Sequence, residues 1–259
     1  MKKMLMMGVM LLVSAVFAAD QVIDLSKKDA WASPKVLAGP DGTLLVKTNV
    51  IITAKQMIPV DDKHIYNFSG QIRKNADAVA GTIYCGFLMY DKDKKNITQV
   101  MASGQKKSVT ELLEPAIKGT KTITIKANPA WIARSYYYVG FNVKEGKLSR
   151  ENSSSNIKNV KKDGDKMIVS FGRALTKDYP AGTKVRIQTT GGYFYSNVVA
   201  GVNENWKSFG KDLKKNQLWA EVAYIRPMIL CNWTLPQGTD KSKVESQYKN
   251  MKLTVKEIK

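Results

Sequence analysis

The chain has 259 residues with 41 basic and 22 acidic side chains, which give a formal net charge of +19. Six of the basic residues are arginines and 35 are lysines, and lysine lacks the planar fork that recognises bases and phosphates. This composition predicts a hydrated basic surface, which serves solubility or attracts anionic glycans and envelopes. Nucleic acid ranks behind these partners because the chain is expected to be exported.

The first residues predict a secretory signal peptide over 1–18. A short cationic start (MKK) precedes an apolar run at 4–13 and a stretch of small residues. Cleavage after Ala18 places Val16 and Ala18 at the two positions that a signal peptidase recognises. A retained membrane anchor needs about 20 apolar residues, and Asp20 arrives too early. We therefore expect a secreted or periplasmic (cell-envelope) protein without membrane insertion, whose mature chain, 19–259, has lost Lys2 and Lys3 and carries a charge of +17.

Short strands separated by turns dominate the mature chain, and little helix is expected. Single helical turns are the best that the apolar spacing allows, at 111–117 and 212–217. Many short strands with regular turn signals predict an all-β domain, a β-sandwich of the jelly-roll type. In chain order, strands are expected at 43–48, 64–73, 81–90, 122–126, 134–143, 166–171, 184–189, 219–233 and 251–258.

One stretch departs from this regular pattern. Residues 146–166 are rich in Ser, Asn and Lys, and they can open an inserted β-hairpin module over about 146–200. No linker splits the chain. The expectation is therefore a single β-sandwich domain over 19–259, with the insertion left open.

Four segments carry a resemblance that extends over most of the mature chain. They are YNFSGQIR at 66–73, GFLMYDKD at 86–93, YIRPMIL at 224–230 and LTVKEI at 253–258. Together they resemble the strands of jelly-roll carbohydrate-binding modules, which are galactose-binding-like β-sandwiches. The resemblance implies a fold more than a ligand. Many such modules hold a structural calcium with an Asp in the final strand; residues 253–258 contain none, so no cofactor is expected.

Residues with catalytic or metal-binding chemistry are sparse. His64 is the only histidine, and the sequence has no Gly-x-Ser-x-Gly elbow, no Cys-x-x-Cys and no His pair. Asp91 and Asp93 could begin a calcium loop, but lysines fill the positions between and after them, which favours a charged turn. A carboxylate pair across a cleft, or a cluster of His64, Arg134 and tyrosines, keeps an enzyme acting on polysaccharide as an alternative.

Cys85 and Cys231 both lie in strand-like runs. In an exported protein the pair permits one disulfide, which would close a long loop. Each is flanked by core-type residues, however, and an unpaired Cys is among the most buried residue types. The sequence leaves both states open because bond geometry decides between them.

Aromatic side chains give the strongest functional signal. Sugar rings pack their C–H faces on aromatic rings, while their hydroxyls bond to amide and charged groups around the rim. Residues two apart on a strand share a face, so pairs of tyrosines can form a platform, and an indole in a polar loop can add to it. The predicted ligand-binding residues are Tyr136, Tyr138, Asn142, Tyr193, Tyr195 and Trp206. For each tyrosine the alternative is packing on an edge strand with a hydrated hydroxyl.

The two tryptophans that bracket the apolar run at 219–233 are expected in the core. Trp131 follows Pro129 in a loop and is, like Trp206, either a cover for the core or a ligand contact.

We expect an exported, non-catalytic carbohydrate-binding protein whose partner is a polysaccharide or envelope glycan, with the lysines favouring acidic sugars. One alternative is a structural or adhesive cell-envelope protein with its aromatic residues at subunit contacts. The other is a polysaccharide lyase or glycoside hydrolase. No catalytic residue is assigned, nucleic acid is not expected as a partner, and the sequence does not define the oligomeric state.

Overall fold

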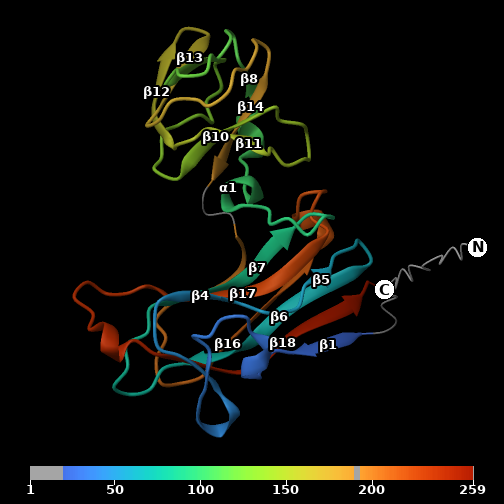
Figure 1. The fold of residues 1–259 in the computed structure, drawn as a ribbon, viewed down its shortest axis with the longest axis vertical. Coiled ribbons are helices and arrows are strands. Elements are labelled where there is room, and N and C mark those ends of the chain that lie inside the picture. The colour runs from blue at the N-terminus through green and yellow to red at the C-terminus, as the bar shows by residue number, and fades with distance from the viewer. Residues whose placement is uncertain (1–19, 190–192, 259) are drawn as a thin grey trace, which may run out of the picture.

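A computed structural model describes residues 20–189 and 193–258, so the predicted signal peptide lies outside the described residues. Nearly all regular structure is strand, and within each sheet the strands pair antiparallel. The prediction of an all-β sandwich is confirmed, whereas the jelly-roll order of the strands stays a prediction. Figure 1 shows the chain as two lobes along the long axis of the molecule. No helix in the described residues has the length and apolarity that crossing a membrane requires.

The lobe that contains the C-terminus consists of two packed sheets, and we call it the sandwich lobe (Figure 1). In spatial order its first sheet contains β16 (Lys207–Lys214), β6 (His64–Arg73), β18 (Ser246–Glu257), β3 (Leu44–Val46) and β2 (Leu37–Ala38), with β1 (Gln21–Asp24) paired to β18. Its second sheet contains β15 (Phe194–Val199), β7 (Thr82–Tyr90), β17 (Tyr224–Thr234) and β4 (Val50–Thr53), with β5 (Ile58–Pro59) paired to β17.

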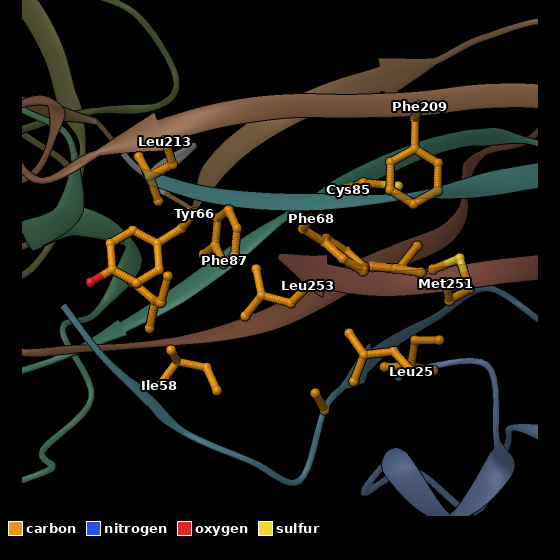
Figure 2. Packing of buried hydrophobic residues seen from close by; sticks show 14 of the residues in the cluster. Leu25, Ile58, Tyr66, Phe68, Cys85, Phe87, Phe209, Leu213, Met251 and Leu253 are labelled. Carbon is orange, nitrogen blue, oxygen red and sulfur yellow. The ribbon is translucent and has the colours of Figure 1, made fainter. Parts of the chain in front are cut away.

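Alternating side chains from both sheets fill the sandwich core (Figure 2). In β6 the burial alternates strictly along all ten residues, as expected for a strand with one face in the core. Phe68 of β6 contacts Phe209 of β16 edge-on, with ring centroids 5.3 Å apart, and Phe87 of the opposite sheet at 6.1 Å. Such edge-to-face pairs add to the free energy that burial of the rings supplies.

The other lobe, the inserted lobe, also contains two sheets. One consists of β11 (Glu151–Asn152), β10 (Tyr137–Phe141), β14 (Lys184–Thr189) and β8 (Thr110–Glu111), and the other of β12 (Ile157–Asp163), β13 (Lys166–Phe171) and β9 (Thr122–Lys126). Phe141 stacks flat on Tyr179 at 3.9 Å between the ring centroids. These side chains belong to a second hydrophobic cluster that is separate from the sandwich core.

The second cluster differs in extent from the insertion expected at about 146–200. Its buried residues run from Leu112 to Ile187, because β8, β9 and β10 are needed to complete the two sheets. β15, which falls inside the expected range, pairs with β7 in the sandwich lobe instead.

The helical turns expected from the sequence are only partly present. Residues 111–117 are not helical; Leu112 bridges Ile125, and Ala116 bridges Tyr179. In the second range, Lys215–Gln217 form a single 3-10 turn, η4, directly after β16. The chain's α-helix within the described residues is the single turn α1 (Gln99–Ala102), which leads from the sandwich lobe into the inserted lobe (Figure 1).

The chain enters and leaves the inserted lobe through two segments that are hydrogen bonded to each other. The amide of Thr189 donates to the carbonyl of Ser103 at 2.8 Å, and that of Gln105 donates to the carbonyl of Ile187 at 2.8 Å. Because entry and exit lie side by side, the strands of the sandwich are not spread apart by the insertion.

Candidate functional site

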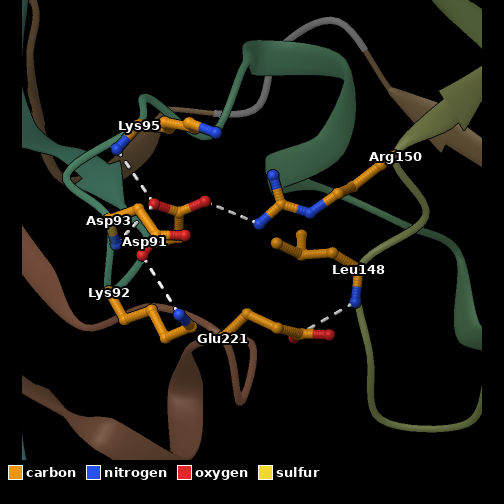
Figure 3. Close-up of polar contacts among 7 residues, drawn as sticks. All are labelled: Asp91, Lys92, Asp93, Lys95, Leu148, Arg150 and Glu221. Atoms are coloured by element: carbon orange, nitrogen blue, oxygen red, sulfur yellow. Dashed lines mark hydrogen bonds and ion pairs between the residues drawn. The ribbon is translucent and has the colours of Figure 1, made fainter.

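The turn that follows β7 in the sandwich lobe contacts the inserted lobe through the side chain of Asp91 (Figure 3). Arg150 donates from Nη2 to Asp91 Oδ2 at 2.8 Å, while Asp91 Oδ1 accepts the backbone amides of Asp93 and Lys95. The hydrogen bond from the Lys95 amide and the Arg150 guanidinium hold the pKa of Asp91 below its usual value. The carboxylate of Asp91 therefore fixes a turn and a lobe contact. Within the described residues, no group of three or more His, Cys, Asp or Glu side chains could hold a metal ion.

Leu148 adds an apolar contact to this junction. It comes from the inserted lobe but belongs to the core cluster of the sandwich lobe, and its amide donates to Glu221 Oε2 at 3.3 Å (Figure 3). Around Asp91 and Leu148 the junction therefore combines an ion pair, a buried leucine and a backbone hydrogen bond to a carboxylate.

A cleft of about 430 Å³ lies at the same junction, within the size range of small-molecule sites. Its aromatic lining comes from the sandwich lobe and consists of Tyr193, Phe194, Tyr195 and Trp219. Polar groups from both lobes complete it: Ser103, Lys106, Asn216 and Gln217. The cleft thus joins aromatic surface to hydroxyl, amide and ammonium groups.

Tyr195 forms a cluster with two other tyrosines, Tyr193 and Tyr84. The rings of Tyr193 and Tyr195 lie 6.0 Å apart and nearly perpendicular, and Tyr84 of β7 lies 5.2 Å from Tyr195. Partial burial, together with Tyr193 and Tyr84, raises the pKa of Tyr195 to about 12. Its hydroxyl is therefore neutral at physiological pH and can both donate and accept a hydrogen bond.

A glycine and a bulge set the position of β15. Gly86 of β7 lies opposite Tyr195, and a Cβ at Gly86 would lie 2.0 Å from the carbonyl oxygen of Phe194. The register between β15 and β7 shifts between Tyr195 and Asn197, which leaves Ser196 as the extra residue. A bulge of this kind changes the direction of the neighbouring side chains, here at the residue that lines the cleft.

Trp219 forms a fixed wall of the cleft. Its side chain is buried, and its Nε1 donates to the carbonyl of Ala102 at 3.1 Å. The guanidinium carbon of Arg186, from β14, lies 4.5 Å from its ring centroid, which is a cation–π distance. Since one ring face is covered by Arg186, we assign Trp219 to the wall rather than to the stacking platform.

Of the six predicted ligand-binding residues, Tyr193 and Tyr195 line this cleft. Tyr136 lies in the turn before β10, is 44% exposed and contacts the ring of Tyr137 at 5.0 Å. Tyr138 is half-buried in β10, opposite Gln188. Because Tyr136 precedes the strand, the alternation that would place it beside Tyr138 does not extend to it.

Asn142 and Trp206 lie elsewhere. Asn142 directly follows β10, has a φ of 53° and donates from its side-chain amide to Glu151 Oε1 at 3.1 Å, so the sequence places an Asn where a left-handed conformation is needed. The ring of Trp206 is contacted by the guanidinium of Arg73 at 4.6 Å and by the ammonium of Lys249 at 4.3 Å. The indole ring of Trp206 is therefore already in contact with two cations of the protein.

Both cysteines and two further tryptophans also have defined positions in the structure. Cys85 and Cys231 are free, buried thiols whose pKa is raised by burial; Cys85 lies directly opposite Ile229 rather than Cys231. Trp233 was expected in the core but is 47% exposed, because the left-handed conformation of the preceding Asn232, with a φ of 53°, breaks the alternation of β17. Trp131 is buried and donates to the carbonyl of Ser108, so it covers the inserted core.

Sequence patterns did not indicate Trp219, which lines the cleft, or the residues behind the lining: Tyr84, Arg186 and Gln188. In β14, Val185 and Ile187 face the inserted core, and the alternation places Arg186 and Gln188 on the opposite face. Alternation alone predicts a hydrated polar face there. The structure buries both side chains, because distant parts of the chain cover them.

Comparisons with known proteins add little to this description. No family model matches the chain, and no curated protein matches it. Among solved structures the chain is similar to VP17, a capsid protein of bacteriophage P23-77, with a TM-score of 0.19 and 7% identity over 93% of this chain and 100% of that chain. A likeness at this level carries no argument about fold or function.

Proposed function

We propose that the cleft at the lobe junction binds carbohydrate and that the protein acts as a non-catalytic binding protein for a polysaccharide or envelope glycan outside the cytoplasm. The observation that supports this best is the pair of Tyr193 and Tyr195 beside a cleft of about 430 Å³ with amide and ammonium groups at its edge. Aromatic surface bordered by a few polar groups suits a ligand with apolar C–H faces and many hydroxyls.

The polar groups of the cleft suit hydroxyl ligands. Asn216 and Gln217 are exposed, and each amide offers both donors and an acceptor. The Oε1 of Gln217 accepts the amide of Lys214 at 2.8 Å, which fixes this side chain before a ligand arrives. A fixed side chain loses less conformational entropy on binding than a mobile one.

The proposal is tested by retention on immobilised polysaccharides. We expect Tyr195→Ala to weaken binding by about tenfold or more, because a central aromatic contact contributes more than 1 kcal/mol. Tyr195→Phe keeps the ring and should retain most of the binding. The matched control is Tyr136→Ala, which removes a tyrosine that does not line the cleft. Melting temperatures of all three variants establish that each is folded.

The same measurements separate the alternatives. Binding that disappears equally for every polysaccharide at high salt would show attraction by the basic surface alone and would overturn the proposal. So would retention that Tyr195→Ala leaves unchanged. Assembly that depends on Tyr195 would support a structural role instead. New reducing ends or unsaturated products would support a glycoside hydrolase or a lyase.

A further inference from the structure

The cleft lined by Tyr193 and Tyr195, which we call the tyrosine cleft, adjoins a second hollow of about 560 Å³, because Lys106 and Gly146 line both. The second hollow lies in the inserted lobe and contains Arg186 in its lining, together with Val109, Val143, Glu145 and Lys184. A ligand in the first cleft can therefore extend a substituent into the second.

Arg186 is a buried cation with incomplete pairing. Its side chain is 1% exposed. Its Nε donates to Gln188 Oε1 at 3.1 Å and its Nη2 to the carbonyl of Lys147 at 3.3 Å. A guanidinium has five N–H donors, and within residues 20–189 and 193–258 Arg186 forms no ion pair. A buried charge without an opposite charge is costly, so the site is poised for an anion.

The charged groups around Arg186 do not form an ion pair with it within the described residues. Lys184 is paired with Glu111 at 2.5 Å. Glu145 lines the hollow, but it is exposed and forms no ion pair with Arg186 in the part of the chain that the structure describes. Burial lowers the pKa of Arg186, while the charge of Glu221 acts in the opposite direction. Because the ordinary pKa of arginine is so high, the guanidinium stays protonated.

Gln188, which accepts the hydrogen bond from Arg186 Nε, has an unpaired polar group of its own. It is fully buried next to Arg186, and its Nε2 has no hydrogen-bond partner among the residues that the structure describes. Gly104 covers this pair: a Cβ there would lie 2.5 Å from Gln188 Oε1 and 2.8 Å from Arg186 Nε. Because Gly104 has no side chain, the backbone can pass directly over these two polar groups. The positions of the Arg186 and Gln188 side chains therefore depend on this glycine.

We propose that the second hollow binds the carboxylate of an acidic sugar whose ring occupies the tyrosine cleft, with Arg186 as the specificity-determining residue. The planar fork of a guanidinium matches a carboxylate with two parallel hydrogen bonds. Lys106, at the border of both hollows, adds a positive charge along the path between them. The inference rests on the proposed carbohydrate function and names the class of sugar: a uronic acid.

The test compares two ligands that differ in one group. Isothermal titration calorimetry measures binding of a uronic-acid oligosaccharide and of the same oligosaccharide with its carboxyls reduced to alcohols, at equal ionic strength. We expect the acidic form to bind at least about tenfold more tightly, because hydrogen bonds to charged groups are the strong ones. Arg186→Gln should reduce the tenfold preference to a ratio near one, and the measured quantity is this ratio because Arg186 also contacts Trp219 in the wall of the tyrosine cleft.

A second variant guards against a folding defect, since Arg186 is buried. Val109 is 42% exposed and lines the hollow without lining the tyrosine cleft. Val109→Trp should block the hollow and abolish the preference without affecting the fold. The control is Lys118→Gln, which removes an exposed cation of the inserted lobe that does not line the hollow.

The outcomes separate this inference from the function on which it rests. Equal affinity of the wild-type protein for the two oligosaccharides overturns the carboxylate site and leaves carbohydrate binding in place. A preference that survives Val109→Trp, or that Lys118→Gln removes equally well, overturns it too. If the wild-type protein binds neither form nor any neutral polysaccharide, the proposed function itself fails.

Discussion

The two lobes build their cores from strands of very different length. The sandwich lobe uses β6, β7, β17 and β18, which have ten, nine, eleven and twelve residues. In the inserted lobe the longest strand of the described residues, β12, has seven. The sandwich packs its aromatic rings edge-on, whereas the inserted lobe centres on the flat stack of Phe141 on Tyr179.

The sandwich does not need the inserted lobe to complete its sheets. All strands of its two sheets come from outside residues 103–189. The entry and exit of the insertion are paired through Ser103 and Thr189, and insertions whose ends lie together are tolerated by a host fold. What the insertion adds is the junction itself, and the candidate site lies at this junction.

The largest expected effect comes from substitutions that destabilise the two hydrophobic cores one at a time. Phe68 and Phe141 are fully buried in different clusters, and a buried Phe→Ala change typically costs about 3–5 kcal/mol. We expect two unfolding transitions in differential scanning calorimetry. Phe141→Ala should lower the transition of the inserted lobe, and Phe68→Ala that of the sandwich lobe.

A milder pair of variants checks this assignment. Phe68→Leu and Phe141→Leu keep most of the buried volume and should shift the same transitions by less. A single transition that moves as a whole in every variant would show that the two lobes unfold as one cooperative unit. The distinction between two independent cores would then be wrong.

An intermediate effect is expected at Leu148, the side chain that the inserted lobe packs into the sandwich core. Leu148→Ala should cost about 2 kcal/mol, the lower end for buried leucines, because the residue lies at the edge of the core. The change should also separate the two transitions further, since it removes an apolar link between the lobes. The matched control is Leu113→Ala; Leu113 is 44% exposed and should leave the calorimetric trace unchanged. A Leu148→Ala trace identical to that of the control would contradict the role of Leu148.

Strands with a regular apolar alternation could be predicted from the sequence to the residue. β6, β9, β13 and β14 lie at the expected positions 64–73, 122–126, 166–171 and 184–189. β16 was missed because its two buried side chains, Phe209 and Leu213, are four residues apart with exposed polar residues between them. Only pairing with β6 makes this segment a strand, and such long-range pairing is not visible in the local pattern.

The site could be predicted only where its residues lie close together in the sequence. Tyr193 and Tyr195 are two residues apart and do lie in contact beside a cleft. Arg186 and Gln188 follow the same rule, but their burial depends on Trp219 and Gly104, which come from other parts of the chain. A basic or amide residue on the outer face of a strand predicts hydration unless the covering segment is known.

The smallest expected effect concerns the charged contact between the lobes and its pH dependence. The pKa of Asp91 is lowered in the folded protein, first by the hydrogen bond from the Lys95 amide and also by Arg150. An Asp in the unfolded chain has a pKa of about 3.9. A carboxyl whose pKa is lower when folded stabilises the protein above the unfolded pKa, and this contribution is lost as the pH falls through the folded value. The contact at the junction should therefore weaken on acidification below about pH 4.

Thermal unfolding of the wild-type protein and of Asp91→Asn over this pH range measures the contribution. Asp91→Asn cannot lose a charge, so its melting temperature should fall less steeply with acidification than that of the wild-type protein. Arg150→Gln should lower stability at neutral pH and reduce the pH dependence only in part, because the backbone amides still stabilise the carboxylate of Asp91. Asp240→Asn is the control. Hydrogen bonds from Ser242 also lower the pKa of Asp240, but Asp240 and Ser242 both lie outside the inserted lobe. If acid shifts the transition of the inserted lobe equally in Asp91→Asn and Asp240→Asn, the ion pair with Arg150 does not hold the two lobes together.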